Sequence, residues 1–191
     1  MTRSIRSTLA VAILAAAISP NAFAGEATIL AQKAEELATN GQHVEALASM
    51  HEAFTKIWDG MPLGVRKILF VAREPGGYGI YEPRIDNIFQ KDEQLVVYSE
   101  PVGFGWQDKG GVYFSDIVVD YAIRNPGGKV LAEQSAFASF TQTSRERSSE
   151  FVARIKLDIT SAVPGSYILA LTFHDQIDIE TTSVDMPFEI R

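Results

Sequence analysis

Histidine and cysteine, the residue types that most often bind transition metals or act as nucleophiles, are scarce in this sequence. It has three histidines and no cysteine, so thiol catalysis, thiolate metal sites and disulfide bonds are excluded. His43 and His51 lie eight residues apart, a spacing that does not give the i, i+4 pair of a helical zinc site. We therefore interpret both as structural residues and predict no catalytic histidine.

An acidic group follows the third histidine near the end of the chain. Asp175, Asp178 and Glu180 come directly after His174, within the predicted turn of the last hairpin. Aspartate supplies turn geometry without any ligand, so we predict no metal site. Binding of calcium or another cation by these three carboxylates is the alternative.

Paired carboxylates could instead support glycoside hydrolysis. Asp116 and Asp120 are four residues apart on a predicted strand, so their side chains share one face. That face lies opposite a row of tyrosine and aliphatic residues expected in the core. We interpret the pair as solubilising charges and predict no catalytic residues; a hydrolase is the third of three functional hypotheses.

Aromatic residues are concentrated between positions 78 and 114, where four glycines surround a tryptophan. Tryptophan and tyrosine on a glycine-framed loop can stack on sugar rings or anchor a protein partner, although strands also bury aromatic residues. The candidate binding residues are Trp106, Phe104, Tyr78 and Tyr81. The glycine-rich segment 75–79 lacks the lysine and hydroxyl residue of a phosphate loop, so we predict no cofactor.

The elements that position these residues change type along the chain. Residues 26–58 contain no proline and have helical periodicity, interrupted at Asn40 and Gly41, which predicts a helical hairpin. From residue 65 onward apolar and polar residues alternate, with frequent turn residues. The predicted strands are 67–72, 94–99, 112–124, 129–140, 151–159, 166–174 and 182–190, with hairpin turns at 125–128 and 144–149. Successive strands without intervening helices favour a mainly β protein, an antiparallel immunoglobulin-like β-sandwich with an N-terminal α-helical hairpin.

Two segments resemble known families. Residues 35–57 resemble a single tetratricopeptide-type repeat through Leu37, Gly41, Val44, Ala46, Leu47 and Ala53. Near the C-terminus, a second pattern resembles the closing hairpin of bacterial exported immunoglobulin-like and fibronectin-type-III-like domains through Pro164, Gly165, Tyr167, Leu169, Leu171, Asp175, Phe188 and Ile190. The resemblance implies an extracellular type of β-sandwich, and it carries no function by itself.

The first 24 residues are typical of a secretory signal. Arg3 and Arg6 precede the apolar run 9–18, and Ala22 and Ala24 provide the small residues of a cleavage site. The expected organisation is a cleaved signal peptide at 1–24, a helical hairpin at 25–60 and a β-sandwich domain at 61–191. We expect a periplasmic protein, with secretion to the medium as the alternative.

The net charge of the chain limits the classes of partner that we expect. Without residues 1–24 the chain has 15 Lys and Arg against 24 Asp and Glu, a formal net charge of −9. Such a chain is a poor candidate for binding nucleic acid or anionic lipid, and no membrane insertion is expected after cleavage. The sequence favours a non-catalytic protein-binding or cell-envelope-organising module, with a glycan-binding module that uses the Trp106 loop as the alternative.

Overall fold

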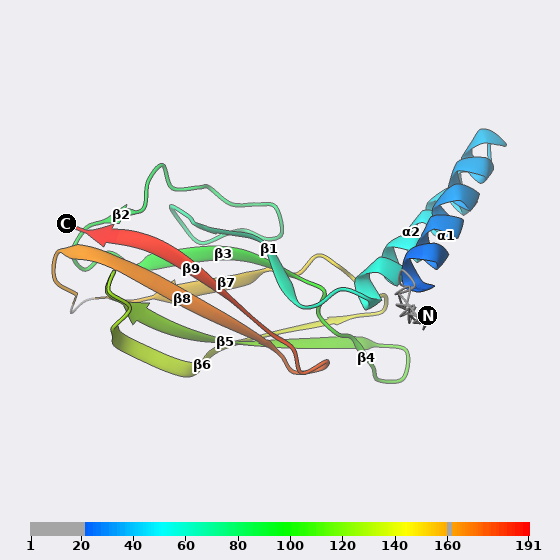
Figure 1. Cartoon of the computed structure of the whole chain (residues 1–191). Helices are drawn as coiled ribbons and strands as arrows, with labels where there is room; N and C mark the ends of the chain where they lie inside the picture. Colours follow the sequence, from blue (N-terminus) through cyan, green and yellow to red (C-terminus); the bar gives the residue numbers. More distant parts are fainter. Residues whose placement is uncertain (1–21, 160–161) are drawn as a thin grey trace, which may run out of the picture. The chain divides into compact units, whose positions relative to one another are not determined.

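The structure is a computed structural model that describes residues 22–159 and 162–191 (Figure 1). Residues 1–21 of the predicted signal peptide lie outside the described residues, and the first helix begins at Ala22. The chain divides into two compact units, residues 1–57 and 58–191, which are described separately below. Within the described residues, neither helix has the length and hydropathy needed to cross a membrane.

Two helices form the predicted hairpin, α1 (Ala22–Thr39) and α2 (His43–Asp59). Gly41 adopts a φ of 77°, a left-handed conformation that ends α1 and lets the chain turn within three residues. The side chains buried between the helices are small: Ala27, Ala34, Ala46, Ser49 and Ala53. The Ser49 hydroxyl donates a hydrogen bond of 2.9 Å to the Leu30 carbonyl, so the two backbones approach closely.

The second unit is mainly β and contains two sheets. The three-stranded sheet has the order β1 (Gly64–Phe70), β3 (Leu95–Val102) and β7 (Ala153–Leu157). The six-stranded sheet has the order β2 (Ile88–Phe89), β9 (Thr181–Ile190), β8 (Gly165–Asp175), β5 (Tyr113–Arg124) and β4 (Gln107–Asp108), and β6 (Val130–Ser144) pairs with β5. All seven predicted strands are present, whereas the two-residue strands β2 and β4 were not predicted.

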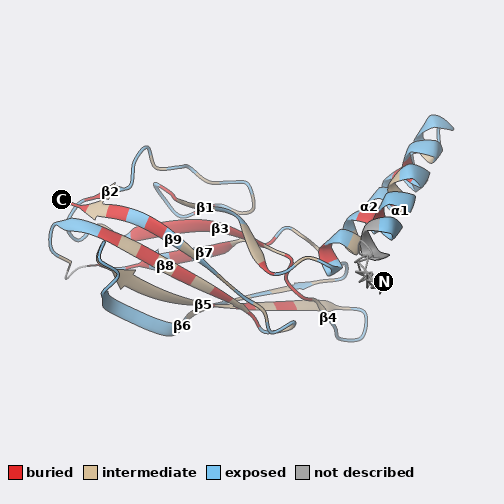
Figure 2. Cartoon of the chain, in the orientation of Figure 1, coloured by how far each residue is buried: buried red, intermediate tan, exposed pale blue. Residues whose placement is uncertain are grey.

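Both sheets contribute to one hydrophobic core. Along β8 every second residue is buried, and β3, β5 and β7 contribute further buried residues to the same cluster. Leu95 and Val97 of β3 share this cluster with Ile117 of β5 and Leu169 of β8. Figure 2 shows the buried segments along these strands in red. The strict alternation in β7 and β8 explains why the sequence predicts these two strands well, whereas β3 is buried at seven successive positions.

Two expectations about connections are wrong. The β2–β9 pair is parallel, with Phe89 opposite Ile190, so the fold is not purely antiparallel. Residues 144–149 do not form a hairpin turn, because β6 belongs to the six-stranded sheet whereas β7 pairs with β3 in the other sheet. The segment is a crossover between sheets, and it places Ala153, Ile155 and Leu157 in the core. The turn at 125–128 does join β5 to β6, with Gly128 at a φ of 83°.

Candidate functional site

Trp106 lies in a short segment that leaves the end of β3. Gly103 opens the segment at a φ of 73°, and a side chain there would collide with the Pro62 carbonyl oxygen. Gly105 is restricted as well, because an added Cβ would lie 2.6 Å from the carboxylate of Asp178. Glycine is therefore required at position 103, whereas a larger residue at position 105 would force the Asp178 side chain to move.

A pocket of about 480 Å³ opens beside this segment. Its walls combine aromatic rings with charged groups: Trp58, Phe104, Trp106, Tyr113, Asp59, Arg147, Asp178 and Glu180. Rings beside several hydrogen-bonding groups are typical of sites for small polar ligands. The structure thus brings Trp106 together with Asp178 and Glu180, two residues that the sequence analysis considered as a separate group.

The two predicted aromatic residues of this segment differ in exposure. The Phe104 side chain is 1% exposed and packs within the core. Trp106 is half-buried, with its ring centroid 5.4 Å from that of Phe104. The Trp58 indole donates a hydrogen bond of 3.0 Å to the Phe104 carbonyl, which holds the segment 103–106 in place. Trp106 is therefore the ring of this pair that a ligand can reach.

Carboxylates outnumber basic groups in the pocket. Arg147 forms an ion pair with Asp59, and this hydrogen bonding raises the pKa of the arginine. Burial raises the pKa of Asp178, and the neighbouring charges of Asp175 and Glu180 raise it further. The pocket is thus an acidic environment containing one guanidinium group that is already paired.

Two of the three candidate metal ligands, Asp175 and Glu180, have other partners. Asp175 is buried, and its two oxygens accept hydrogen bonds from the backbone N–H groups of Gly105 (2.6 Å) and Ile177 (2.8 Å). Glu180 accepts a hydrogen bond from the Leu63 N–H. The part of the chain that the structure describes has no group of three His, Cys, Asp or Glu residues arranged to hold a metal ion. These carboxylates instead fasten neighbouring segments to the β8–β9 turn.

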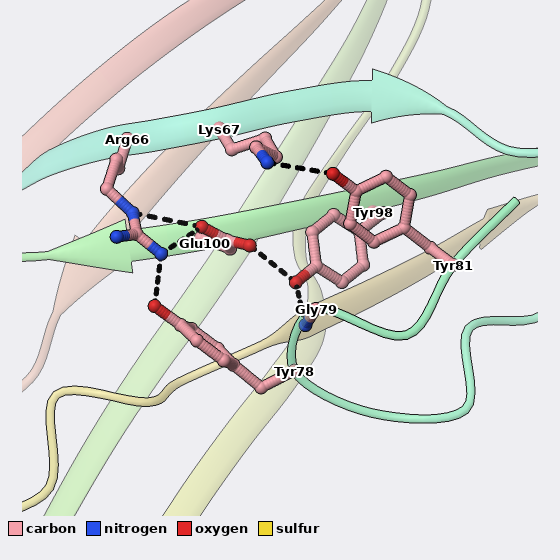
Figure 3. A network of polar contacts seen from close by, with 7 residues as sticks. All are labelled: Arg66, Lys67, Tyr78, Gly79, Tyr81, Tyr98 and Glu100. Carbon is pink, nitrogen blue, oxygen red and sulfur yellow. Dashed lines mark hydrogen bonds and ion pairs between the residues drawn. The ribbon is translucent and has the colours of Figure 1, made fainter. Parts of the chain in front are cut away.

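Tyr78 and Tyr81 belong to a different place, the polar network shown in Figure 3. This network lies on the face of β3 that carries Tyr98 and Glu100, and Tyr98 belongs to a buried cluster separate from the main hydrophobic core. A register shift between Val65 and Lys67 marks a bulge in β1, opposite Glu100. Such a bulge re-aims side chains, and both Arg66 and Lys67 extend over this face (Figure 3).

Glu100 is the centre of the network and is only 2% exposed. Its carboxylate accepts a hydrogen bond of 2.6 Å from the Tyr98 hydroxyl, and two from Arg66 at 3.0 and 2.6 Å. The Tyr98 oxygen in turn accepts a hydrogen bond from the Gly79 N–H at 2.8 Å. The contacts therefore attach the long connection between β1 and β2 to the sheet.

The network also shifts the acidity of its members. Burial alone would raise the pKa of Glu100, but the hydrogen bonds from Tyr98 and Arg66 outweigh it and keep the pKa below its usual value. Burial, reinforced by the hydrogen bond to Glu100, raises the pKa of Tyr98 to about 12. Tyr78 and Tyr81 accept hydrogen bonds from Arg66 and Lys67, so both are engaged within the protein. We interpret the network as a structural support.

The carboxylates considered for hydrolysis also have partners. Asp120 accepts a hydrogen bond from the Ala136 N–H at 2.7 Å and lies 2.8 Å from Nε2 of His174. Asp116 accepts a weaker bond of 3.2 Å from the Ser139 hydroxyl. The Asp120–His174 pair depends on the register between β5 and β8, which the sequence does not specify.

The hairpin carries an exposed apolar surface on α2. Large apolar residues of α2 are exposed along one side, and we call this set the Leu47 stripe: Val44, Leu47, Met50, Phe54 and Ile57. Leu47 is 72% exposed and Val44 80%, whereas Ala46 and Ala53 are buried against α1. The helix thus buries its small residues and exposes its large ones.

Comparison with known proteins does not assign the chain to a family. No protein-family model matches the chain, and no curated protein matches its sequence. Among solved structures, one similar chain is the Pseudomonas fluorescens alkylpurine DNA glycosylase AlkC, bound to DNA containing an abasic site analog. The identity is 14% and the TM-score 0.36, and the match covers 80% of this chain and 40% of the glycosylase.

Two expectations are corrected by this comparison. The expected resemblance to exported immunoglobulin-like and fibronectin-type-III-like domains with a tetratricopeptide-like hairpin is wrong, because the solved structure found is a DNA glycosylase. The expected exclusion of nucleic acid as a partner is withdrawn, since that structure contains DNA. A TM-score of this size assigns neither a family nor a partner to this chain.

Proposed function

We propose that the chain is an exported, periplasmic, non-catalytic protein that binds another protein or helps to organise the cell envelope. The observation that carries this proposal is the Leu47 stripe. Soluble proteins rarely leave several large apolar side chains together in water, and such patches mark interaction sites. A partner that covers the stripe gains the burial of five large side chains on a rigid helix.

The rigidity of this surface supports the proposal. Ala46, Ser49 and Ala53 fix α2 against α1 through close packing, so the exposed residues are held at helical spacing before any partner arrives. Residues of a preformed helix lose little conformational freedom when they bind. The fitting partner is a protein with an apolar groove that accepts side chains spaced along one helix face.

The test is site-specific photo-cross-linking in the periplasm, with the photoreactive residue at position 47. Cross-links to a defined protein are expected, and Leu47→Glu should reduce recovery of that protein by about tenfold or more, as loss of an interface hot spot does. Gln32→Glu adds the same charge at an exposed position of α1 and is the matched control. Equal recovery with both variants would contradict the proposal.

Export has its own test. Signal peptidase cleavage between Ala24 and Gly25 predicts a mature chain that begins with Gly25. Intact-mass measurement and N-terminal sequencing of protein from the periplasmic fraction check this prediction. Protein that still begins with Met1 and remains in the cytoplasm would overturn it.

For the fold, we propose that the two sheets face each other as a β-sandwich. The proposal is supported by the single cluster of buried residues to which both sheets contribute. Sheets that face one another in this way share a core about 10 Å thick. Long-range distances measured by NMR between Val97 and Leu171 side chains would test it.

Glycan binding at the Trp106 pocket is the second candidate function. It is favoured by a half-buried indole beside hydroxyl and carboxylate groups, an arrangement that suits stacking and hydrogen bonding to a sugar. Trp106→Ala should abolish retention on the immobilised envelope glycan, while Tyr81→Ala, an aromatic residue of the Glu100 network, should leave it unchanged. Glycan turnover that Asp120→Asn abolishes would favour the third hypothesis, a hydrolase.

A further inference from the structure

Strand β6 forms an open edge of the six-stranded sheet. Its residues pair with β5 from Tyr113 to Arg124, and Figure 1 shows it at the margin of the sheet. Among the described residues, β6 pairs with no strand other than β5, and no backbone–backbone hydrogen bond from another segment reaches its 15 residues. One side of the strand therefore presents backbone donors and acceptors that another strand can bind.

The other long edges carry residues that discourage such pairing. Charged residues occur on β1 (Arg66 and Lys67) and on β7 (Arg154 and Lys156). Along β9 the stretch beyond its contact with β2 includes Pro187, which lacks an N–H donor. Charges and proline are the usual means by which sheet edges avoid association.

Strand β6 lacks these protections. Glu133 is its only charged residue, and it has no proline. Beyond a bulge at Ala136, which has a φ of 48°, residues 138–144 are uncharged and pair regularly with β5. On the outer face of this segment, Ser139, Thr141 and Thr143 are exposed. An uncharged, regular strand of this length is well suited to accept another strand.

We propose that this edge binds the same edge of a second copy of the chain, in an antiparallel arrangement with its two-fold axis at Thr141. The sequence of the segment is complementary to itself in this register. Thr141 then faces Thr141 of the second copy, and Ser139 faces Thr143 of the second copy. Pairs of threonine and serine across antiparallel strands are favourable.

The absence of charged residues from the paired segment supports a second copy as the occupant. In this register residues 138–144 of one copy pair only with residues 138–144 of the other, and none of them is charged, so no like charges meet. The two-fold axis uses the same segment on both chains, so the contact closes after two copies. The assembly joins the two six-stranded sheets into one continuous sheet.

The first experiment uses the absence of cysteine from the sequence. A single Thr141→Cys substitution in the full chain places two thiols across the axis, and mild oxidation should form a disulfide-linked dimer. Ser183→Cys, at an exposed position of β9 on the same sheet face, is the matched control and should remain monomeric. Ser139→Cys mixed with Thr143→Cys should cross-link to each other, which tests the register.

The second experiment measures association directly by sedimentation equilibrium over a concentration series. The unmodified chain should dimerise, and Thr141→Lys should raise the dissociation constant at least about tenfold, because like charges directly opposite are destabilising. Ser183→Lys should not change it, and neither should Leu47→Glu if the Leu47 stripe binds a different partner.

Several results would overturn the inference. A monomer at every concentration would do so, as would cross-linking by Ser183→Cys to the same extent as by Thr141→Cys. Dimerisation that Leu47→Glu abolishes and Thr141→Lys leaves intact would assign self-association to the helical hairpin. Failure of cross-linking to a periplasmic protein at position 47 would contradict the proposed function alone and leave this inference standing.

Discussion

The Glu100 carboxylate is a buried charge whose contacts are almost all with protein. Buried ion pairs contribute little net stability, because the loss of hydration offsets much of their attraction. Removing one partner is nevertheless costly, since the other charge is left without compensation. For Glu100 the consequence is specific: its carboxylate, Tyr98 and Arg66 together help to hold the connection that carries Gly79 on the sheet.

Replacing Glu100 should change how stability depends on pH. Because its pKa is lower in the folded than in the unfolded chain, ionised Glu100 stabilises the fold above the unfolded-state pKa. This contribution is lost as the pH falls through the folded-state pKa. Glu100→Gln should therefore be less stable at neutral pH and lose less stability between about pH 5 and pH 3. Urea denaturation at several pH values measures this, with Glu82→Gln at an exposed site as the control.

Two aromatic residues should respond differently to truncation. Tyr167 is buried, stacks on Phe188 and donates a hydrogen bond to the Val163 carbonyl, so Tyr167→Ala should cost roughly 3 to 5 kcal/mol. Half-buried Trp106 lies at the pocket, and Trp106→Ala should cost only about 1 to 2 kcal/mol. Chemical denaturation gives both values. An equal loss in both variants would show that Trp106 is a core residue with no separate role.

At the scale of elements, the helical hairpin is held together by small side chains. Ala53 is buried where α2 meets α1, so there is no room for a larger residue. Ala53→Leu should cost about 1 to 3 kcal/mol through overpacking. Ala48→Leu, at an exposed position on the same helix, should have almost no effect. Thermal unfolding followed by circular dichroism distinguishes the two variants.

The sequence predicts elements well wherever one periodicity covers many residues. In β8, Leu169, Leu171 and Phe173 alternate with less buried residues, and the strand is found within one residue of its expected limits. The helix break at Gly41 is also predicted, because glycine favours the left-handed conformation found there. These features depend on local chemistry alone.

Features that depend on pairing between distant segments are not predictable in this way. The two-residue strand β2 is too short to show any periodicity, and its parallel partner lies at the far end of the chain. The exposure of the Leu47 stripe is not predictable because a helical period identifies an apolar face without saying which face meets the neighbouring helix. The Trp106 pocket combines segments around Asp59, Gly105, Arg147 and Asp178, whose proximity results only from the completed fold.

At the scale of the whole molecule, the boundary between the two units falls inside α2. The division lies between Ile57 and Trp58, three residues before the boundary expected from the sequence. Trp58 is buried with Phe104 at a ring distance of 5.1 Å, whereas its neighbour Ile57 is 60% exposed. The last turn of α2 therefore contributes to the core of the β unit.

Substitutions on the two sides of this boundary test it. Trp58→Ala should destabilise the β unit by roughly 3 to 5 kcal/mol through the loss of a buried ring and its hydrogen bond. Ile57→Ala should change stability by less than about 0.5 kcal/mol. Denaturation monitored by the near-ultraviolet signal of the β unit provides the measurement. Similar losses of stability in the two variants would contradict a boundary between Ile57 and Trp58 and would favour the boundary after residue 60 that the sequence predicts.

The parallel pairing of Phe89 with Ile190 has a consequence for the timing of folding. Strands β8 and β9 supply core residues such as Leu169 and Phe188, so the core remains incomplete until these two strands have been synthesised. Contacts between segments this far apart in sequence form slowly. A nascent chain that cannot complete its core early stays unfolded for longer, a property that fits the export that we propose.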